Sequence, residues 1–242
     1  PEVALGLILM TLPLVWVGIR STGRYRRMAT PDGGVASPAS HTRRTALRDA
    51  QFWSVAAPFA LAMFAMFGAM VYQVSYLLPL IGVSGTSLAL ICSNISGAGG
   101  RLLMSAVIDN LDQRLAAAAT FATQAVALTL MIAMPHSPVA LYLGCILFGL
   151  CVGNVNALPT LIIQREFAPS SFGVILGLST AIGQVGYSLS PPLLGIVRDL
   201  TGDYRPVLGA CVGLQLVATC LVLVGPIKLR LPKRQRNLPQ CG

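Results

Sequence analysis

The residue whose type and position most strongly suggest chemistry is Arg101, a cationic side chain inside an apolar stretch. It alone interrupts the otherwise charge-free run 86–106. Gly97 stands one helical turn before it and Asn94 two turns before it, so small and polar side chains share its face of a helix. Such a face suits a water-filled pocket in which a guanidinium holds a carboxylate through two hydrogen bonds.

Further polar side chains lie within or beside apolar stretches and are candidates to line the same pocket. Each could equally form a hydrogen bond between helices, worth about 0.6 kcal/mol on average. Those beside glycine or proline breakers, where a cavity would open, rank highest after Arg101. The candidates for substrate contact are Asn94, Asn154, Asn156, Gln184 and Tyr76, and the remaining groups are Tyr72, Gln73, Gln124 and Tyr187.

The composition places these residues in a membrane protein. Hydrophobic residues make up 55% of the 242-residue chain and charged residues only 10%, which is too few to coat a soluble domain. Seven windows are long and apolar enough to cross a bilayer as helices, whereas a barrel strand alternates and spans only about 10 residues. The predicted spans are 3–19, 52–74, 86–106, 115–134, 139–163, 173–197 and 206–227.

The position of Arg101 within a span leaves three interpretations open. An arginine at the centre of a span costs at least about 2.5–3.5 kcal/mol, so another group must compensate for it. Arg101 could contact an anionic substrate, form a structural or gating pair, or extend its charged head to the membrane interface. No Asp or Glu occurs within the six later windows, which excludes a permanent buried ion pair inside them.

The basic residues set the orientation of the spans. Twelve of the 17 Lys and Arg residues lie in two regions, 20–51 and 228–242. With one span between successive loops, Arg114 and Arg165 fall on the same side, which the positive-inside rule makes cytoplasmic. The loop from Pro79 to Gly85 then faces outward. The candidate gating residues at the cytoplasmic end are Asp109, Arg114 and Arg165.

The chain divides at the long basic connection of residues 20–51. This segment is rich in Arg, Gly, Ser, Pro and Thr and has no apolar periodicity, so we expect a flexible linker. It is either a solvated tether or a contact with anionic lipid heads. Residues 1–19 would form the last helix of an N-terminal bundle missing from the sequence, 52–227 a six-helix bundle, and 228–242 a cytoplasmic tail.

The six later spans predict an all-α membrane fold made of two inverted three-helix repeats. Transporters often contain such repeats. A faint similarity between 102–109 and 193–199 supports the repeat, with chance similarity as the alternative. Prolines within spans, at Pro58, Pro159 and Pro191-Pro192, predict broken helices that line a cavity or bend at a gate.

Three segments resemble the major facilitator superfamily, and more specifically its monocarboxylate porters. GGRLLMSAVIDNLDQR at 99–114 resembles the superfamily's motif between helices 8 and 9. SPPLLGIVRDLTGDY at 190–204 is similar to the end of helix 11 in monocarboxylate porters, and RDAQFW at 48–53 resembles the start of helix 7 in bacterial members. The resemblance implies helices 6 to 12 of a twelve-helix carrier of the bacterial inner membrane.

The resemblance also implies roles for individual residues. The family's arginine of helix 8, implicated in binding the substrate carboxylate, corresponds to Arg101, and the loop aspartate of its conformational latch corresponds to Asp109. Animal members carry a proton-handling aspartate where this chain has Gly97, so a coupling proton lacks that acceptor here. The span 173–197 lacks the lysine of oxalate-type relatives, which favours a monoanion over a dianion.

The leading hypothesis is a secondary transporter of a small organic anion that works by alternating access with an N-terminal half. An efflux pump for amphipathic compounds and a truncated, non-transporting homologue are the alternatives. We expect no enzyme, cofactor or metal site, because no span pairs His, Asp, Glu or Cys at suitable spacing. The expected partners are the anion, a coupling proton, the lipid bilayer and the N-terminal half, and nucleic acid is excluded because the basic residues flank spans.

Overall fold

The described part of the chain lies within one of its two compact units. The computed structural model describes residues 47–107, 112–167 and 171–224. The chain divides into units 1–39 and 40–242, and every described residue belongs to the second. The predicted helix 1–19, most of the linker 20–51, Asp109 and the tail 228–242 lie outside the described residues.

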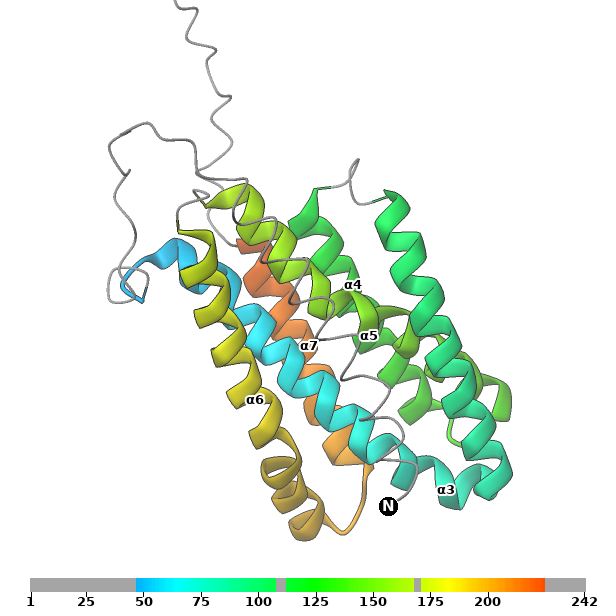
Figure 1. Ribbon diagram of the computed structural model, residues 1–242. Helices are drawn as coiled ribbons and strands as arrows, with labels where there is room; N and C mark the ends of the chain where they lie inside the picture. The colour runs from blue at the N-terminus through cyan, green and yellow to red at the C-terminus, as the bar shows by residue number, and fades with distance from the viewer. Residues whose placement is uncertain (1–46, 108–111, 168–170, 225–242) are drawn as a thin grey trace, which may run out of the picture. The chain divides into compact units, whose positions relative to one another are not determined.

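Five long apolar helices make up the described residues, and these residues contain no strand (Figure 1). The helices are α3 (Ala50–Val107), α4 (Gln113–Ala133), α5 (Pro138–Glu166), α6 (Phe172–Thr201) and α7 (Arg205–Val224). Each is long and apolar enough to cross a membrane. The predicted all-helical fold is therefore confirmed, but the spans predicted as 52–74 and 86–106 belong to one helix with a sharp bend.

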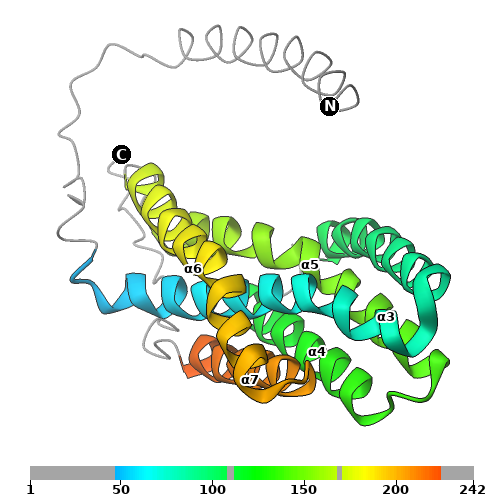
Figure 2. The same ribbon diagram turned by 90° about the horizontal axis from the view of Figure 1, so that it is seen from below.

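The bend in α3 is made by a single residue, Gly82. Its φ of 69° and ψ of 178° lie in a region of backbone space that essentially only glycine occupies. We call residues 50–81 the first arm of α3 and residues 83–107 the second arm; Figure 2 shows the second arm turning back beside α5. The two predicted spans are thus separated within 79–85 as expected, but by a turn at Gly82 and not by a loop of seven residues.

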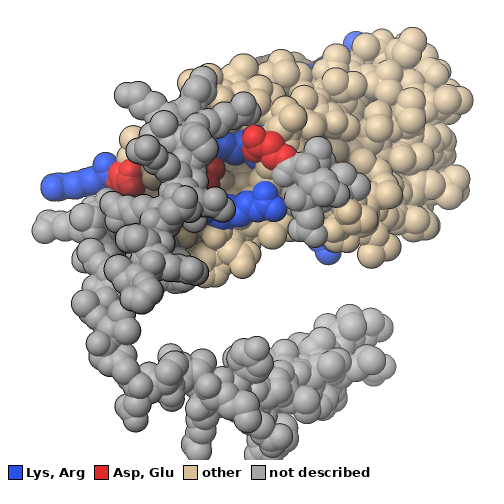
Figure 3. Space-filling model, turned by 90° about the horizontal axis from the view of Figure 1, so that it is seen from above, with Lys and Arg blue, Asp and Glu red and all other residues tan. Residues whose placement is uncertain are grey.

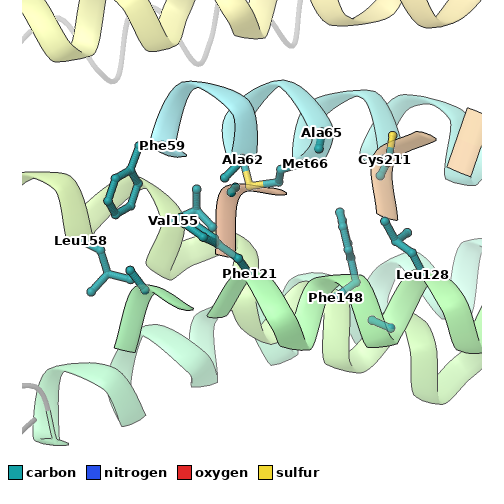
Figure 4. Packing of buried hydrophobic residues seen from close by; sticks show 14 of the residues in the cluster. Phe59, Ala62, Ala65, Met66, Phe121, Leu128, Phe148, Val155, Leu158 and Cys211 are labelled. Atoms are coloured by element: carbon teal, nitrogen blue, oxygen red, sulfur yellow. The ribbon is translucent and has the colours of Figure 1, made fainter. Parts of the chain in front are cut away.

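The first arm of α3 is the central element of the core. Its buried residues recur every three or four positions, which places them on one helix face. Figure 4 shows side chains of α3, α4, α5 and α7 converging on this face. Phe59 of α3 and Phe121 of α4 pack edge to face with ring centroids 5.2 Å apart. The core therefore fixes the first arm and leaves the second arm to be held by other contacts.

The second arm of α3 is held by α5, backbone against backbone. A Cβ on Gly100 would overlap the carbonyl oxygen of Leu150, and one on Gly149 would overlap that of Ser93. The hydroxyl of Ser96 donates to the carbonyl oxygen of Ile146 at 2.9 Å across the same interface. Glycines allow this close approach, which is how helices associate in a membrane without a hydrophobic driving force.

α6 buries only a narrow stripe of its surface. The buried residues are Ile175, Ser179, Gly183, Ser190 and Leu194, spaced by four or seven positions. The stripe faces the first arm of α3, where the Ser190 hydroxyl donates to the carbonyl oxygen of Phe64 at 2.6 Å. Most of the apolar surface of α6 therefore remains uncovered by the described residues.

The prolines within the spans do not break the helices. α6 runs through Pro191-Pro192 to Thr201, and α3 and α5 run through Pro58 and Pro159. Beside these prolines, the Tyr72 hydroxyl of α3 donates to the carbonyl oxygen of Pro191 at 2.8 Å. The predicted breaks at these prolines are therefore wrong.

Gly100→Ala should destabilise the bundle, whereas Gly99→Ala should not. Both changes raise helix propensity by about 1 kcal/mol, but only a Cβ at Gly100 meets the backbone of α5. A Cβ at Gly99 meets nothing within 4 Å. Overpacking at Gly100 should cost about 1–3 kcal/mol, measured as a lower midpoint of thermal unfolding in detergent. Equal midpoints for the two variants would contradict the close α3–α5 packing.

Candidate functional site

Arg101 lies on the second arm of α3, six residues before the end of that helix at Val107. At about 1.5 Å per residue, its Cα is about 9 Å from the helix end. Its side chain crosses α5 at Gly153, where a Cβ would lie 2.5 Å from both Cγ and Nε of Arg101. Glycine at position 153 therefore leaves the space that the arginine side chain occupies.

The Arg101 guanidinium forms no hydrogen bond or ion pair with any described residue. All carboxylates of the described residues lie at or beside helix ends, and they are Asp49, Asp112, Glu166, Asp199 and Asp203. Arg101, an exposed side chain about 9 Å from the end of its helix, therefore has no described anion beside it. The interpretation of Arg101 as half of a structural ion pair finds no support within the described ranges.

Two hollows border Arg101. One is a cavity of about 230 Å³ between the two arms of α3 and α5. Its walls include Met70, Gln73, Asn94, Arg101, Phe148 and Gly153. The other is a wider groove of about 490 Å³, whose walls include Arg101, Ser105, Asn154 and Asn156. The arginine side chain therefore borders both spaces and can offer its donors to a ligand in either.

Asn94 and Asn154 reach these hollows with their amide nitrogens already engaged. Asn94 lines the cavity, and its Nδ2 donates to the carbonyl oxygen of Leu90 at 2.8 Å. Asn154 lines the groove, and its Nδ2 donates to the carbonyl oxygen of Leu150 at 3.2 Å. Each side chain can therefore accept a hydrogen bond from a ligand through its oxygen, while Arg101 supplies the donors.

Asn156 and Gln184 meet in a third and smaller hollow. This space of about 100 Å³ lies between α3, α5 and α6 beside Pro159. Asn156 also lines the groove, so it is shared by the hollow near Gln184 and the groove beside Arg101. The structure thus brings five of the six predicted substrate residues to three neighbouring spaces.

Tyr76 does not join the other predicted substrate residues. Only 5% of its surface is exposed, and its hydroxyl donates to the carbonyl oxygen of Met131 at 3.0 Å. Tyr76 lies on the same buried face of α3 as Gln73 and Ala69, which turns its ring toward α4. Its hydrogen bond therefore joins two helices, the alternative that the sequence had left open for this residue.

The backbone of α5 closes the space beside Gly97. A Cβ at Gly97 would lie 3.1 Å from the carbonyl oxygen of Gly149. A side chain at this position would therefore require the backbone of α5 to shift by a few tenths of an ångström.

A cluster of charged and polar groups joins four helix ends. Arg114 at the start of α4 forms a two-pronged ion pair with Glu166 at the end of α5, with Nε–Oε1 at 2.6 Å and Nη2–Oε2 at 2.8 Å. It also donates to the Ser54 hydroxyl at 3.0 Å and to the carbonyl oxygen of Val222 at 3.5 Å. Figure 3, which looks onto this end of the bundle, shows acidic and basic side chains gathered near its centre.

Of the other two predicted gating residues, Arg165 has a partner of its own and Asp109 lies outside the described residues. In the amide orientation that satisfies both of its atoms, Gln113 donates to the carbonyl oxygen of Leu161 at 2.9 Å and accepts from Nε of Arg165 at 3.0 Å. Arg165 therefore has its own partner beside Arg114. Asp109 lies outside the described residues, so its relation to either arginine stays a prediction.

The sequence did not single out two residues that the structure brings forward. Glu166 pairs with Arg114, and α5 proves three residues longer than the predicted span that ended at position 163. The sequence did contain a signal for Glu166, because this glutamate directly follows Arg165 at the end of an apolar run. Gln73 was grouped with the helix-to-helix hydrogen bonds, yet it also lines the cavity of Arg101.

The Arg114–Glu166 pair should contribute measurably to stability, whereas the Arg198–Asp199 pair should not. The side chains of the first pair are 19% and 22% exposed, and those of the second 45% and 72%. A double-mutant cycle with Arg114→Met and Glu166→Gln should give a coupling of about 1.5–3 kcal/mol in detergent unfolding. The matched cycle with Arg198→Met and Asp199→Asn should give about 0.2–1 kcal/mol, and equal couplings would argue against the cluster.

Comparison with known proteins identifies the family of this bundle. The family model of the Major Facilitator Superfamily matches residues 3–191, which is well over half of the chain. No curated protein matches the chain significantly. Members of this superfamily are membrane transporters and not enzymes, which agrees with the five membrane-length helices. The chain therefore belongs to the Major Facilitator Superfamily.

Proposed function

We propose that this chain is part of a secondary transporter that moves a small organic anion, of the monocarboxylate type, by alternating access. The observation that carries the proposal is the Arg101 guanidinium, which borders two hollows and has no partner among the described residues. In this function Arg101 binds the carboxylate of the substrate through two parallel hydrogen bonds. Asn94, Asn154, Asn156 and Gln184 line the path around it.

The energetic argument rests on what compensates the charge of Arg101. An arginine inside a membrane span costs at least about 2.5–3.5 kcal/mol, and the described carboxylates all lie at helix ends. Water in the cavity compensates part of this cost in the empty carrier. A bound carboxylate compensates more, because charge-assisted hydrogen bonds are stronger than those to water in a space of low dielectric.

The proposed carrier contains more than the described bundle. We treat the two arms of α3 as separate helices, so that the arms with α4 form one triplet and α5, α6 and α7 form an inverted second triplet. The uncovered surface of α6, which buries only one stripe, supports a second half that packs against it. Residues 1–19 would then be the last helix of that N-terminal half.

In the proposed orientation, the end of the bundle that carries Arg114 and Glu166 faces the cytoplasm of a bacterial cell, as does the C-terminus. The concentration of basic residues in 20–51 and 228–242 supports this orientation. Arg114, Arg165 and Asp109 would act there as a gate.

Glu166→Gln should then slow anion exchange in reconstituted vesicles while leaving anion affinity unchanged, because the Arg114–Glu166 pair holds helix ends and does not touch the cavity.

Arg101→Gln should abolish most carboxylate transport by the full-length protein in proteoliposomes. Loss of two charge-assisted hydrogen bonds should lower the apparent affinity for the carboxylate about tenfold to a hundredfold. Arg101→Lys keeps the charge but loses the paired geometry, so it should fall between parent and Arg101→Gln. The measurement is uptake of a panel of labelled carboxylates with and without a pH gradient.

Arg198→Gln is the matched control, because Arg198 is an exposed arginine near the opposite end of the bundle and pairs with Asp199. Its uptake should equal that of the parent. The proposal is wrong if no carboxylate is transported or competes, or if both Arg101 variants transport like the parent. Retained export of amphipathic compounds by these variants would support an efflux pump in its place.

A further inference from the structure

Gln73 lies in the wall of the cavity that also contains Arg101, and it is 2% exposed. Its Nε2 donates to Sγ of the buried Cys145 on α5 at 3.0 Å. This contact fixes which end of the amide is engaged by the protein. The nitrogen is held by α5, and the carbonyl oxygen is the group that remains.

The carbonyl oxygen of Gln73 accepts no hydrogen bond from any described residue. This oxygen is not among the buried side-chain atoms that lack a partner, so it borders the cavity and can accept a hydrogen bond from a molecule there. In the orientation of the structure, with the amide nitrogen facing Sγ of Cys145, Gln73 therefore presents an acceptor to the cavity.

Gln73 and Arg101 lie at different levels of the same cavity. Gln73 contacts α5 at Cys145 and Arg101 contacts it at Gly153, eight residues further on and about 12 Å along the helix axis. Side chains on a helix lean toward its N-terminus, which brings the Arg101 guanidinium back toward Gln73 and shortens that separation. The space between the two groups suits one ring or a short hydrocarbon chain.

The walls between these two polar ends are largely apolar. Met70, Leu90, Phe148 and Val152 contribute hydrocarbon, sulfur or aromatic surface, and Gly97 and Gly149 leave one side flat. The volume of about 230 Å³ exceeds the roughly 150 Å³ of a cavity that accommodates benzene. The cavity is therefore large enough for a ring with substituents at both ends.

We propose that this cavity selects a carboxylate with an apolar ring or branched body and a hydroxyl at the end remote from the carboxylate. Arg101 binds the carboxylate, Phe148 and Met70 contact the body, and the Gln73 carbonyl oxygen accepts a hydrogen bond from the hydroxyl. Gln73 is thus a specificity-determining residue. The inference rests on the proposed anion transport, because Arg101 must first hold the carboxylate.

The test compares 4-hydroxybenzoate with benzoate, which differ only in the remote hydroxyl, in proteoliposomes containing the full-length protein. The parent should take up 4-hydroxybenzoate with about tenfold higher kcat/KM than benzoate, the contribution of one well-placed hydrogen bond. Gln73→Met keeps the size of the side chain but removes the acceptor. It should bring the ratio of the two kcat/KM values close to one, and this ratio is the readout because Gln73 lines the cavity that both compounds would occupy.

Benzoate uptake separates failure of this inference from failure of the proposed function. If the parent transports both compounds equally, or if Gln73→Met keeps the parent's preference, Gln73 contacts only water and the inference is wrong, although anion transport stands. If the parent transports no carboxylate at all, the proposed function itself fails, and this inference fails with it.

A second pair of variants covers the case in which Gln73→Met does not fold. Cys145→Ser retains an acceptor for the Gln73 nitrogen, and Cys145→Ala removes it. The preference for 4-hydroxybenzoate should survive in Cys145→Ser and fall in Cys145→Ala, because only the second releases the amide. An unchanged preference in Cys145→Ala would overturn the role of the oriented amide.

Discussion

The structure depends on one electrostatic constraint, a guanidinium held within an apolar helix while every described carboxylate lies at a helix end. A permanently charged group in that position needs polar surroundings, and the Arg101 side chain is exposed and not enclosed by the described residues. Gly153 makes room for the side chain, and two hollows border it. The small residues near Arg101 therefore explain the site as much as the polar residues do.

The same glycines that join the second arm of α3 to α5 also shape the cavity. Gly97 and Gly149 bring the two backbones into contact and at the same time form part of the cavity wall. This double use ties the shape of the cavity wall to the packing of the two helices, because a side chain at residue 97 would require the α5 backbone to shift. Stability and the shape of the cavity thus arise from a single packing arrangement.

The all-helical membrane class was predictable from the sequence, because apolar length and helical spacing carry that information. Helical spacing also put Arg101 and Asn94 on one face, and both line the same cavity, whereas their role in binding stays a prediction. Long-range contacts were not predictable. Tyr76 turns to α4 because of its place on the buried face, and Glu166 joins a cluster only because four helix ends meet there.

The prolines within the spans led to wrong predictions of helix breaks for a related reason. α6 continues through Pro191-Pro192, and Pro79 lies inside a helix whose direction changes three residues later. Propensity describes what a residue disfavours in isolation, whereas neighbouring helices determine whether that preference prevails. The predicted outward loop was therefore replaced by one glycine.

That glycine separates the two arms of α3, which are held by different contacts. The first arm of α3 is fastened to α6 through Tyr72 and Ser190, and the second is seated on α5. Arg101 lies 19 residues beyond Gly82, a lever of about 28 Å along the second arm. The separation of the two arms at Arg101 is therefore set both by the backbone angles of this one glycine and by the glycine contacts that hold the second arm on α5.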